Sequence, residues 1–284
     1  MRVTRFLVPA WAMLASASAF GDTTAPAPAH DAFTLQASRP AEVRHINVYK
    51  PPGYETCKGP YPILYMPDGG VQEDFPHVVE AVDSAIRKGE IQPLIVVGIE
   101  NTQRRRDMTG PIQVASDKDI APHVGGSAAF RDFIAKELVP AIEKRYRVNA
   151  HRGIIGESLA GLFSVESFLR QPDLFDTVIA ISPSLWWNDA RLLGEAPGLL
   201  HGKSATRRIY LTSADEDQIP ADTAKLATIL KKQASSGLNW TYVPRPKEHH
   251  DTIYLASQAD ALRWAYGPAG HSGGTCPVDE SNIK

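Results

Sequence analysis

The segment Gly153-Ile154-Ile155-Gly156-Glu157-Ser158-Leu159-Ala160-Gly161 decides the fold of this 284-residue chain. A short apolar run precedes Ser158, and a longer run that reaches Arg170 follows it. The first run predicts a buried β-strand, and the second predicts an α-helix. Small residues around Ser158 permit a sharp turn between the two. We therefore expect the Ser158 hydroxyl to project above the end of a sheet, where it could act as a nucleophile.

Two other serines match a similar Gly-x-Ser pattern, and their surroundings exclude both as nucleophiles. Ser127 precedes a helical pattern that starts at Ala128, so we predict that Ser127 is an N-cap. Ser272 lies in a polar, Gly-rich stretch with no strand before it and no acid and histidine pair after it. Ser158 is the predicted nucleophile.

Outward from this segment, short apolar runs alternate with longer helical runs. Several short runs are apolar throughout, as in strands buried on both faces. This alternation predicts an α/β fold with a mostly parallel central sheet and helices on both faces. The predicted strands are His45–Tyr49, Ile63–Met66, Leu94–Ile99, Gly153–Ile155, Thr177–Ile181, Arg208–Leu211 and Trp240–Val243. The predicted helices are 159–170, 221–234, 252–265 and Phe130–Tyr146, which Pro140 should kink or break.

A serine hydroxyl needs a neighbouring base, and in this fold the acid and the histidine follow the serine in that order. The loop after the strand Arg208–Leu211 offers three acids, Asp215, Glu216 and Asp217. We favour Asp217, which stands three residues after a small residue at the strand end. After the last strand, His249 and His250 both qualify as the base.

The oxyanion of an ester intermediate needs backbone N–H donors. The residue after the nucleophile, Leu159, supplies one at the start of a helix. The loop after the strand Ile63–Met66 reads Pro67-Asp68-Gly69-Gly70. Glycine lets the backbone approach a substrate closely, so we predict Gly69 as the second donor, with Gly70 as the alternative.

Both ends of the chain differ from the middle in composition. Residues 1–19 combine Arg2 and Arg5, a short apolar run and Ala17-Ser18-Ala19, which is typical of a cleaved signal peptide. We predict a flexible lead-in over 20–40, a catalytic domain over 41–267 and a tail over 268–284. Because export leads to an oxidising compartment, we hypothesise a disulfide between Cys57 and Cys276.

Composition excludes several classes of protein. The formal net charge is −2 and no long basic run occurs, so nothing supports nucleic-acid binding. We expect no metal site, because the two cysteines lack the spacing of a zinc site and the sequence has no His-Glu-x-x-His motif. No phosphate-binding glycine motif is present, and we expect no cofactor. The apolar run near the N-terminus is too short to anchor the mature chain in a membrane.

Five motifs in order resemble the putative-esterase branch of the α/β-hydrolases, which includes esterase D-like enzymes and ferric-siderophore esterases. The resemblance covers roughly residues 42–266. The motifs are Tyr65-Met66-Pro67-Asp68-Gly69, Val97-Gly98-Ile99-Glu100-Asn101-Thr102, Arg104 to Thr109, Gly156 to Phe163, and Ile181 to Asn188.

The resemblance implies an α/β-hydrolase fold and hydrolysis of a small-molecule ester through an acyl-enzyme. It favours His250 as the base, because Glu248-x-His250-x-Thr252 fits the register of the family. Arg104, Arg105, Trp186 and Trp187 are candidates for the border of the substrate pocket, and the two tryptophans could equally belong to the core. For Arg106 and Asp107 we expect an internal ion pair that holds a loop. Acyl transfer on the same fold and a non-catalytic ligand-binding module remain alternatives, and the oligomeric state stays open.

Overall fold

The computed structural model describes residues 28–114, 117, 123–200, 206–233 and 237–268. These residues build one eight-stranded sheet in the order β1-β2-β4-β3-β5-β6-β7-β8. The first two strands pair antiparallel with each other, β2 pairs antiparallel with β4, and every other pair is parallel. The strands are β1 (His30–Ser38), β2 (Ala41–Tyr49), β3 (Tyr61–Pro67), β4 (Ile95–Ile99), β5 (Val148–Glu157), β6 (Thr177–Ile181), β7 (Arg207–Ser213) and β8 (Leu238–Pro244).

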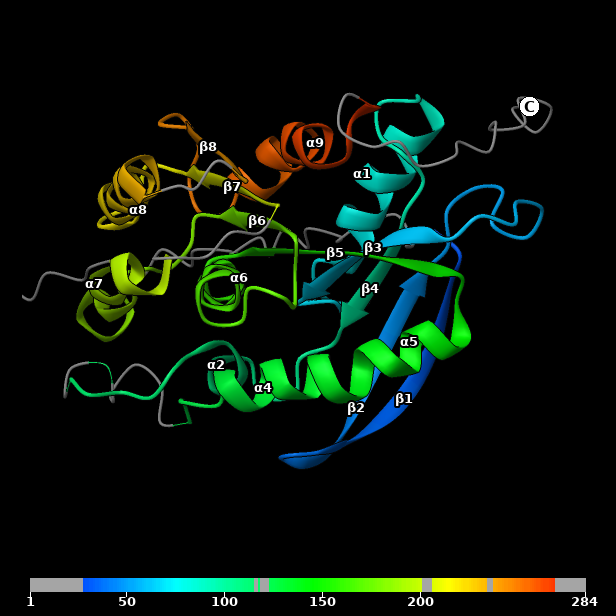
Figure 1. Cartoon of the computed structure of the whole chain (residues 1–284), viewed down its shortest axis with the longest axis horizontal. Coiled ribbons are helices and arrows are strands. Elements are labelled where there is room, and N and C mark those ends of the chain that lie inside the picture. Colours follow the sequence, from blue (N-terminus) through cyan, green and yellow to red (C-terminus); the bar gives the residue numbers. More distant parts are fainter. Residues whose placement is uncertain (1–27, 115–116, 118–122, 201–205, 234–236, 269–284) are drawn as a thin grey trace, which may run out of the picture.

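Helices cover both faces of the sheet, as the sequence predicts (Figure 1). Every residue of β3 is buried, and its side chains alternate between two apolar clusters. Ile63 and Tyr65 pack on the side of α6, while Leu64 and Met66 pack on the side of α1 and α9. One face carries α1 (Phe75–Arg87) and α9 (Ile253–Tyr266); the other carries α4 (Ser127–Phe133), α5 (Val139–Arg145), α6 (Leu159–Arg170), α7 (Trp187–Leu200) and α8 (Ile219–Gln233).

The helical segment 127–145 is interrupted, and the interruption confirms the expected effect of Pro140. A π-helical turn, η1 (Ile134–Leu138), separates α4 from α5. Proline has no N–H to donate, and its ring crowds the carbonyl four residues earlier, so the preceding turn widens. Ser127 itself is the first residue of α4, and Gly126 takes the N-cap position predicted for Ser127.

Four elements differ from the sequence prediction. The lead-in predicted for 20–40 is wrong over His30–Ser38, because these residues form β1 against β2. The alternating run Phe33-Thr34-Leu35-Gln36-Ala37-Ser38 carries the strand signal, since it places Phe33, Leu35 and Ala37 on the core side. The other three are the helices α1, α7 and α2 (Arg104–Met108), which the sequence pattern did not predict.

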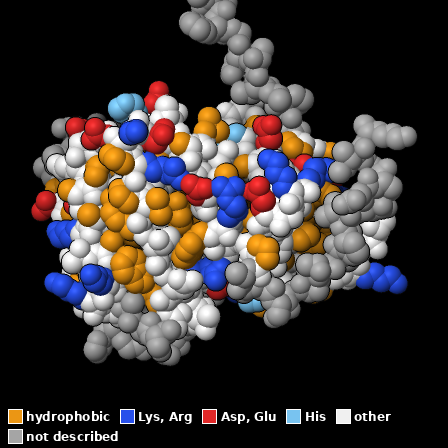
Figure 2. All heavy atoms as spheres, turned by 90° about the horizontal axis from the view of Figure 1, so that it is seen from above, with side chains coloured by type: hydrophobic (Ala, Val, Ile, Leu, Met, Phe, Trp, Pro, Cys, Tyr) orange, Lys and Arg blue, Asp and Glu red, His pale blue; other side chains and the backbone are white. Residues whose placement is uncertain are grey.

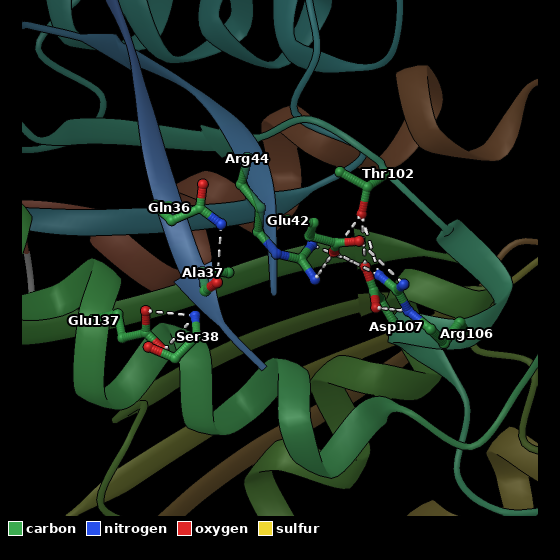
Figure 3. A network of polar contacts seen from close by, with 9 residues as sticks. All are labelled: Gln36, Ala37, Ser38, Glu42, Arg44, Thr102, Arg106, Asp107 and Glu137. Atoms are coloured by element: carbon green, nitrogen blue, oxygen red, sulfur yellow. Dashed lines mark hydrogen bonds and ion pairs between the residues drawn. The ribbon is translucent and has the colours of Figure 1, made fainter. Parts of the chain in front are cut away.

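A polar network ties β2 to α2 (Arg104–Met108), the short helix that follows β4 (Figure 3). Arg44 is fully buried and its guanidinium lies 2.8 Å from Asp107 Oδ2 and 2.7 Å from Glu42 Oε1. Arg106 binds the same two carboxylates, at 2.7 Å from Asp107 and 2.6 Å from Glu42. The predicted Arg106–Asp107 ion pair is therefore confirmed, and the network fixes the loop that leaves the end of β4.

The outer face over α1 and α9 mixes charges of both signs with apolar side chains (Figure 2). Arg263 of α9 illustrates the pattern, since it lies 2.8 Å from Glu90 and 2.5 Å from Asp260. Among the residues that the structure describes, no helix has the length and apolar character needed to cross a membrane.

Candidate active site

Ser158 occupies a strained turn between β5 and α6, as the sequence predicts. Its backbone has φ 57° and ψ −117°, in a region that residues with a side chain rarely adopt. Neighbouring small residues make the turn possible. A Cβ at Gly156 would lie 2.6 Å from the Ala160 Cβ, and a Cβ at Gly161 would lie 2.9 Å from the Ile181 carbonyl oxygen. The turn leaves Ser158 half-buried at the carboxyl end of the sheet.

A second turn, Ser182–Pro183–Ser184, fixes the position of Ser158. The Ser158 N–H donates to the carbonyl of Ile181 at 3.0 Å, and the Ser184 N–H donates to the carbonyl of Ser158 at 3.0 Å. The Ser184 hydroxyl lies 3.2 Å from Ser158 Oγ. On its other side the same turn holds the loop after β7, because Ser182 Oγ accepts a hydrogen bond from the Ala214 N–H at 3.0 Å. Hydrogen bonds of this turn, one of them made by the Ser182 hydroxyl, thus connect the serine turn to the loop after β7.

His250 pairs with Glu216. The imidazole Nδ1 lies 2.6 Å from Glu216 Oε2, and the Glu216 side chain is 15% exposed. The preference for Asp217 as this partner is wrong. The Asp215 N–H donates to the Glu248 carbonyl at 2.9 Å, which joins the two loops and directs the next side chain, Glu216, at the ring. A carboxylate on Nδ1 leaves Nε2 of the ring as the nitrogen that can accept a proton.

Ser158 and the His250–Glu216 pair share one cavity of about 790 Å³. Its walls come from the β5 turn, the segment after β6, the start of α8 and the loop before α9. The lining residues are Ser158, Ser184, Trp186, Glu216, Asp217, Gln218, Ile219 and His250. His249 is not among them, and its backbone instead bonds Thr252 at the start of α9.

The predicted second oxyanion donor is not available. The Gly69 N–H donates to the carbonyl of Ile99 at 3.0 Å, because the backbone of the β3 loop packs directly on β4. A Cβ at Gly69 would lie 2.3 Å from the Gly98 Cα, so glycine serves this close approach. The N–H of the alternative, Gly70, donates to Glu73 Oε2 at 2.7 Å. Leu159 begins α6, where a backbone N–H has no carbonyl within its own helix to bond.

The four residues expected at the pocket border lie in different places. Trp186 lines the cavity that holds Ser158. Trp187 is 5% exposed and lines a separate cavity of about 350 Å³, with its indole N–H 3.3 Å from the Gly110 carbonyl. Arg104 forms a two-point ion pair with Asp68, at 2.7 and 2.8 Å. Arg105 is exposed and does not line the cavity of Ser158.

Glu157, the residue before Ser158, is a site feature that the sequence analysis did not predict. Burial, with the nearby Asp74 and Glu216 carboxylates, raises the pKa of Glu157 to about 8, although Arg104 acts in the opposite direction. Glu157 is therefore largely neutral at pH 7. No local sequence signal indicates this shift, because Asp74 lies in the loop before α1 and Glu216 lies in the loop before α8, both far from Glu157 in the chain.

Two further expectations concern other groups. Among the described residues, no group of three or more His, Cys, Asp or Glu side chains is arranged to hold a metal ion. Cys57 lies in the turn-rich segment after β2, whereas Cys276 lies outside the described residues. The Cys57–Cys276 disulfide stays a prediction.

The family can now be assigned. Residues 37–259 match the model of the family described as "Putative esterase". The chain belongs to this family. The match covers the whole sheet from the end of β1 and both loops that supply Glu216 and His250.

Named relatives agree with this assignment. The chain is 29% identical over 253 residues to the ferri-bacillibactin esterase BesA of Bacillus subtilis, covering 80% of this chain and 86% of that protein. It is 30% identical over 202 residues to a siderophore triacetylfusarinine C esterase of Aspergillus fumigatus, covering 65% of each chain. This family member is a carboxylic ester hydrolase.

A solved structure shows the same fold. The crystal structure of an IroE-like serine hydrolase from Shewanella oneidensis has a TM-score of 0.77 and 26% identity, covering 83% of this chain and 79% of that one. The predicted α/β-hydrolase fold is confirmed.

Proposed function

We propose that this protein is a serine esterase in which Ser158 is the nucleophile, His250 the base and Glu216 the acid. One observation carries the proposal: a serine on a strained strand-to-helix turn lines the same cavity as a histidine whose Nδ1 is held by a carboxylate. A weak hydroxyl nucleophile needs such a base, and the base needs a third group to orient it.

In the proposed reaction, Ser158 Oγ attacks the ester carbonyl while His250 Nε2 accepts its proton. Glu216 stabilises the imidazolium, and the Leu159 N–H donates to the oxyanion. His250 then returns the proton to the leaving alcohol, which departs and leaves an acyl group on Ser158. Water, deprotonated by His250, attacks this acyl group and releases the acid. The Ser184 hydroxyl, 3.2 Å from Ser158 Oγ, holds the nucleophile before substrate enters.

Hydrolysis of 4-nitrophenyl butyrate by wild type, Ser158→Ala and His250→Ala tests the proposal. We expect each variant to lose at least about 10³-fold in kcat, because nucleophile and base act as a unit. A fluorophosphonate probe should label wild type on the peptide that contains Ser158 and should not label Ser158→Ala. Ser127→Ala is the matched control, because Ser127 is buried at the start of α4 and lies outside this cavity. An undiminished rate in Ser158→Ala would refute the serine mechanism.

We propose siderophore-type esters as the substrate class, which the names of the two esterase relatives support. The cavity is large enough for part of such a ligand, since ligand sites typically measure about 300–1,000 Å³. Comparing kcat/KM for iron-free and ferric siderophore esters with kcat/KM for simple aryl esters tests this class. A preference for the simple ester over every siderophore would contradict it.

We further propose that the protein is exported to the periplasm or secreted, with residues 1–19 removed as a signal peptide. The support is the sequence alone, since residues 1–27 lie outside the described residues. N-terminal sequencing of the exported protein should begin at Phe20. A mature chain that retains Met1 would contradict the proposal.

A further inference from the structure

Asp217 lines the catalytic cavity, but neither the ion pair with His250 nor any other described contact uses its side chain. It lies next to Glu216 and two residues before the start of α8, and it is exposed. No hydrogen bond or ion pair joins its carboxylate to another residue in the described part of the chain, and it does not cap the first turn of α8. A negative charge therefore faces the space that a bound ester must enter.

The rest of the cavity wall does not balance this charge. Among the described lining residues there is no lysine or arginine, and the second acid, Glu216, is engaged with His250. The nearby cation Arg104 is paired at two points with Asp68 and does not line the cavity. An anionic substrate group would thus meet Asp217 without a compensating cation.

Trp186 adds a surface that favours positive charge. Its ring lines the same cavity, beside that of Trp187 at a centroid distance of 6.0 Å. The face of an indole attracts ammonium and guanidinium groups, and an unpaired carboxylate nearby strengthens this preference. Ile219 supplies the apolar part of the wall, which suits the carbon chain that carries such a group.

We propose that Asp217 is a specificity residue, which makes this esterase prefer esters that carry a cationic group near the scissile bond over esters that carry an anionic one. This inference rests on the proposed function and adds the charge of the substrate to it. Uncharged esters are intermediate. Among iron chelates, uncharged ferric complexes are favoured over strongly anionic ones.

Three 4-nitrophenyl esters of similar length test the proposal: the pentanoate, the monoester of adipic acid, and the ester of 5-(trimethylammonio)pentanoic acid. The measured quantity is the ratio of kcat/KM for the cationic ester to kcat/KM for the anionic ester, after subtraction of spontaneous hydrolysis. In wild type we expect a ratio of about 10 or more at low salt, because partly solvated charges at cavity distances change rates by roughly a factor of 3 to 10 each. The ratio should fall as ionic strength rises.

Asp217→Asn should lower this ratio about fivefold, and Asp217→Lys should bring it below 1. Asp215→Asn is the matched control, because Asp215 is exposed in the same loop and does not line the cavity. Its ratio should stay within about 1.5-fold of wild type. Circular dichroism of each variant verifies the fold.

An unchanged ratio in Asp217→Asn, or an equal decrease in Asp215→Asn, would overturn the inference. A wild-type preference for the adipate monoester would also overturn it. Failure of the proposed function is recognised separately by the neutral pentanoate. If wild type does not hydrolyse it faster than Ser158→Ala, the serine mechanism is wrong, and this inference fails with it.

Discussion

Replacement of Glu216 by glutamine tests which acid serves His250. The variant keeps the shape of the side chain but removes the charge that faces Nδ1 at 2.6 Å. An imidazolium and a carboxylate whose charge centres lie about 4 Å apart attract by about 4 kcal/mol at an effective dielectric constant of about 20. The His250 side chain is 54% exposed, so solvent weakens this attraction, and we take about 3 kcal/mol. This energy corresponds to a decrease in kcat of about 10² to 10³-fold.

The assay is steady-state hydrolysis of 4-nitrophenyl butyrate at pH 7.5, with kcat and KM determined separately. We expect kcat to fall and KM to change less than threefold, because the charge on His250 develops only as the proton is transferred. Asp215→Asn should equal wild type, and Asp217→Asn should lose less than tenfold in kcat. A decrease of less than tenfold in Glu216→Gln, or a larger loss in Asp217→Asn, would refute the assignment of Glu216.

Three predictions concern stability, measured as the free energy of unfolding in urea. Because the pKa of Glu157 is about 8 in the folded protein and near 4.5 in the unfolded chain, the unfolded chain releases this proton first, so stability falls as pH rises between these values. Glu157→Gln should therefore be more stable than wild type by about 4 kcal/mol at pH 9 and by less than about 1 kcal/mol at pH 5, and a difference independent of pH would contradict this. Gly69→Ala should lower the free energy of unfolding by about 3 kcal/mol, since the new Cβ would lie 2.2 Å from the Ile99 nitrogen. Gly59→Ala is the control: the space around Gly59 is open, so this change should lower the free energy of unfolding by less than about 0.5 kcal/mol. Arg44→Met should lower the free energy of unfolding by about 3 kcal/mol, because it leaves the buried Asp107 carboxylate with one cation fewer. A decrease below about 1 kcal/mol would show that Arg106 alone is enough to compensate the Asp107 charge.

Local sequence was enough to place Ser158, the proposed nucleophile, on its turn, whereas the preference for His250 over His249 came from the resemblance to the family. The turn at Ser158 needs only an apolar strand, small neighbouring residues and a following helix, and all three can be recognised from the amino-acid sequence. The acid could not be chosen in the same way, because Asp215, Glu216 and Asp217 are adjacent and carry the same type of group. The choice depends on the hydrogen bond from Asp215 to the carbonyl of Glu248, which joins residues far apart in the chain.

Other differences have the same origin in contacts between distant segments. The sequence predicts that the Gly69 N–H donates to the substrate, but in the structure this N–H donates to the carbonyl of Ile99 in the neighbouring strand. In α7, Asn188 and the next two residues have positive φ angles, which no residue pattern predicts. Distant contacts hold this turn: the Asn188 side chain accepts from the Gln113 N–H at 2.8 Å and donates to the Pro111 carbonyl at 3.1 Å.

The Ser182–Pro183–Ser184 turn separates chemistry from selectivity. Because hydrogen bonds of its main chain and of the Ser182 hydroxyl hold Ser158 and the loop after β7, side chains such as Asp217 and Gln218 can be exchanged without moving the proposed nucleophile. Substitution libraries restricted to these two positions could therefore change which esters the protein prefers while the rest of the structure stays the same. Natural sequence divergence at the same positions could have the same effect.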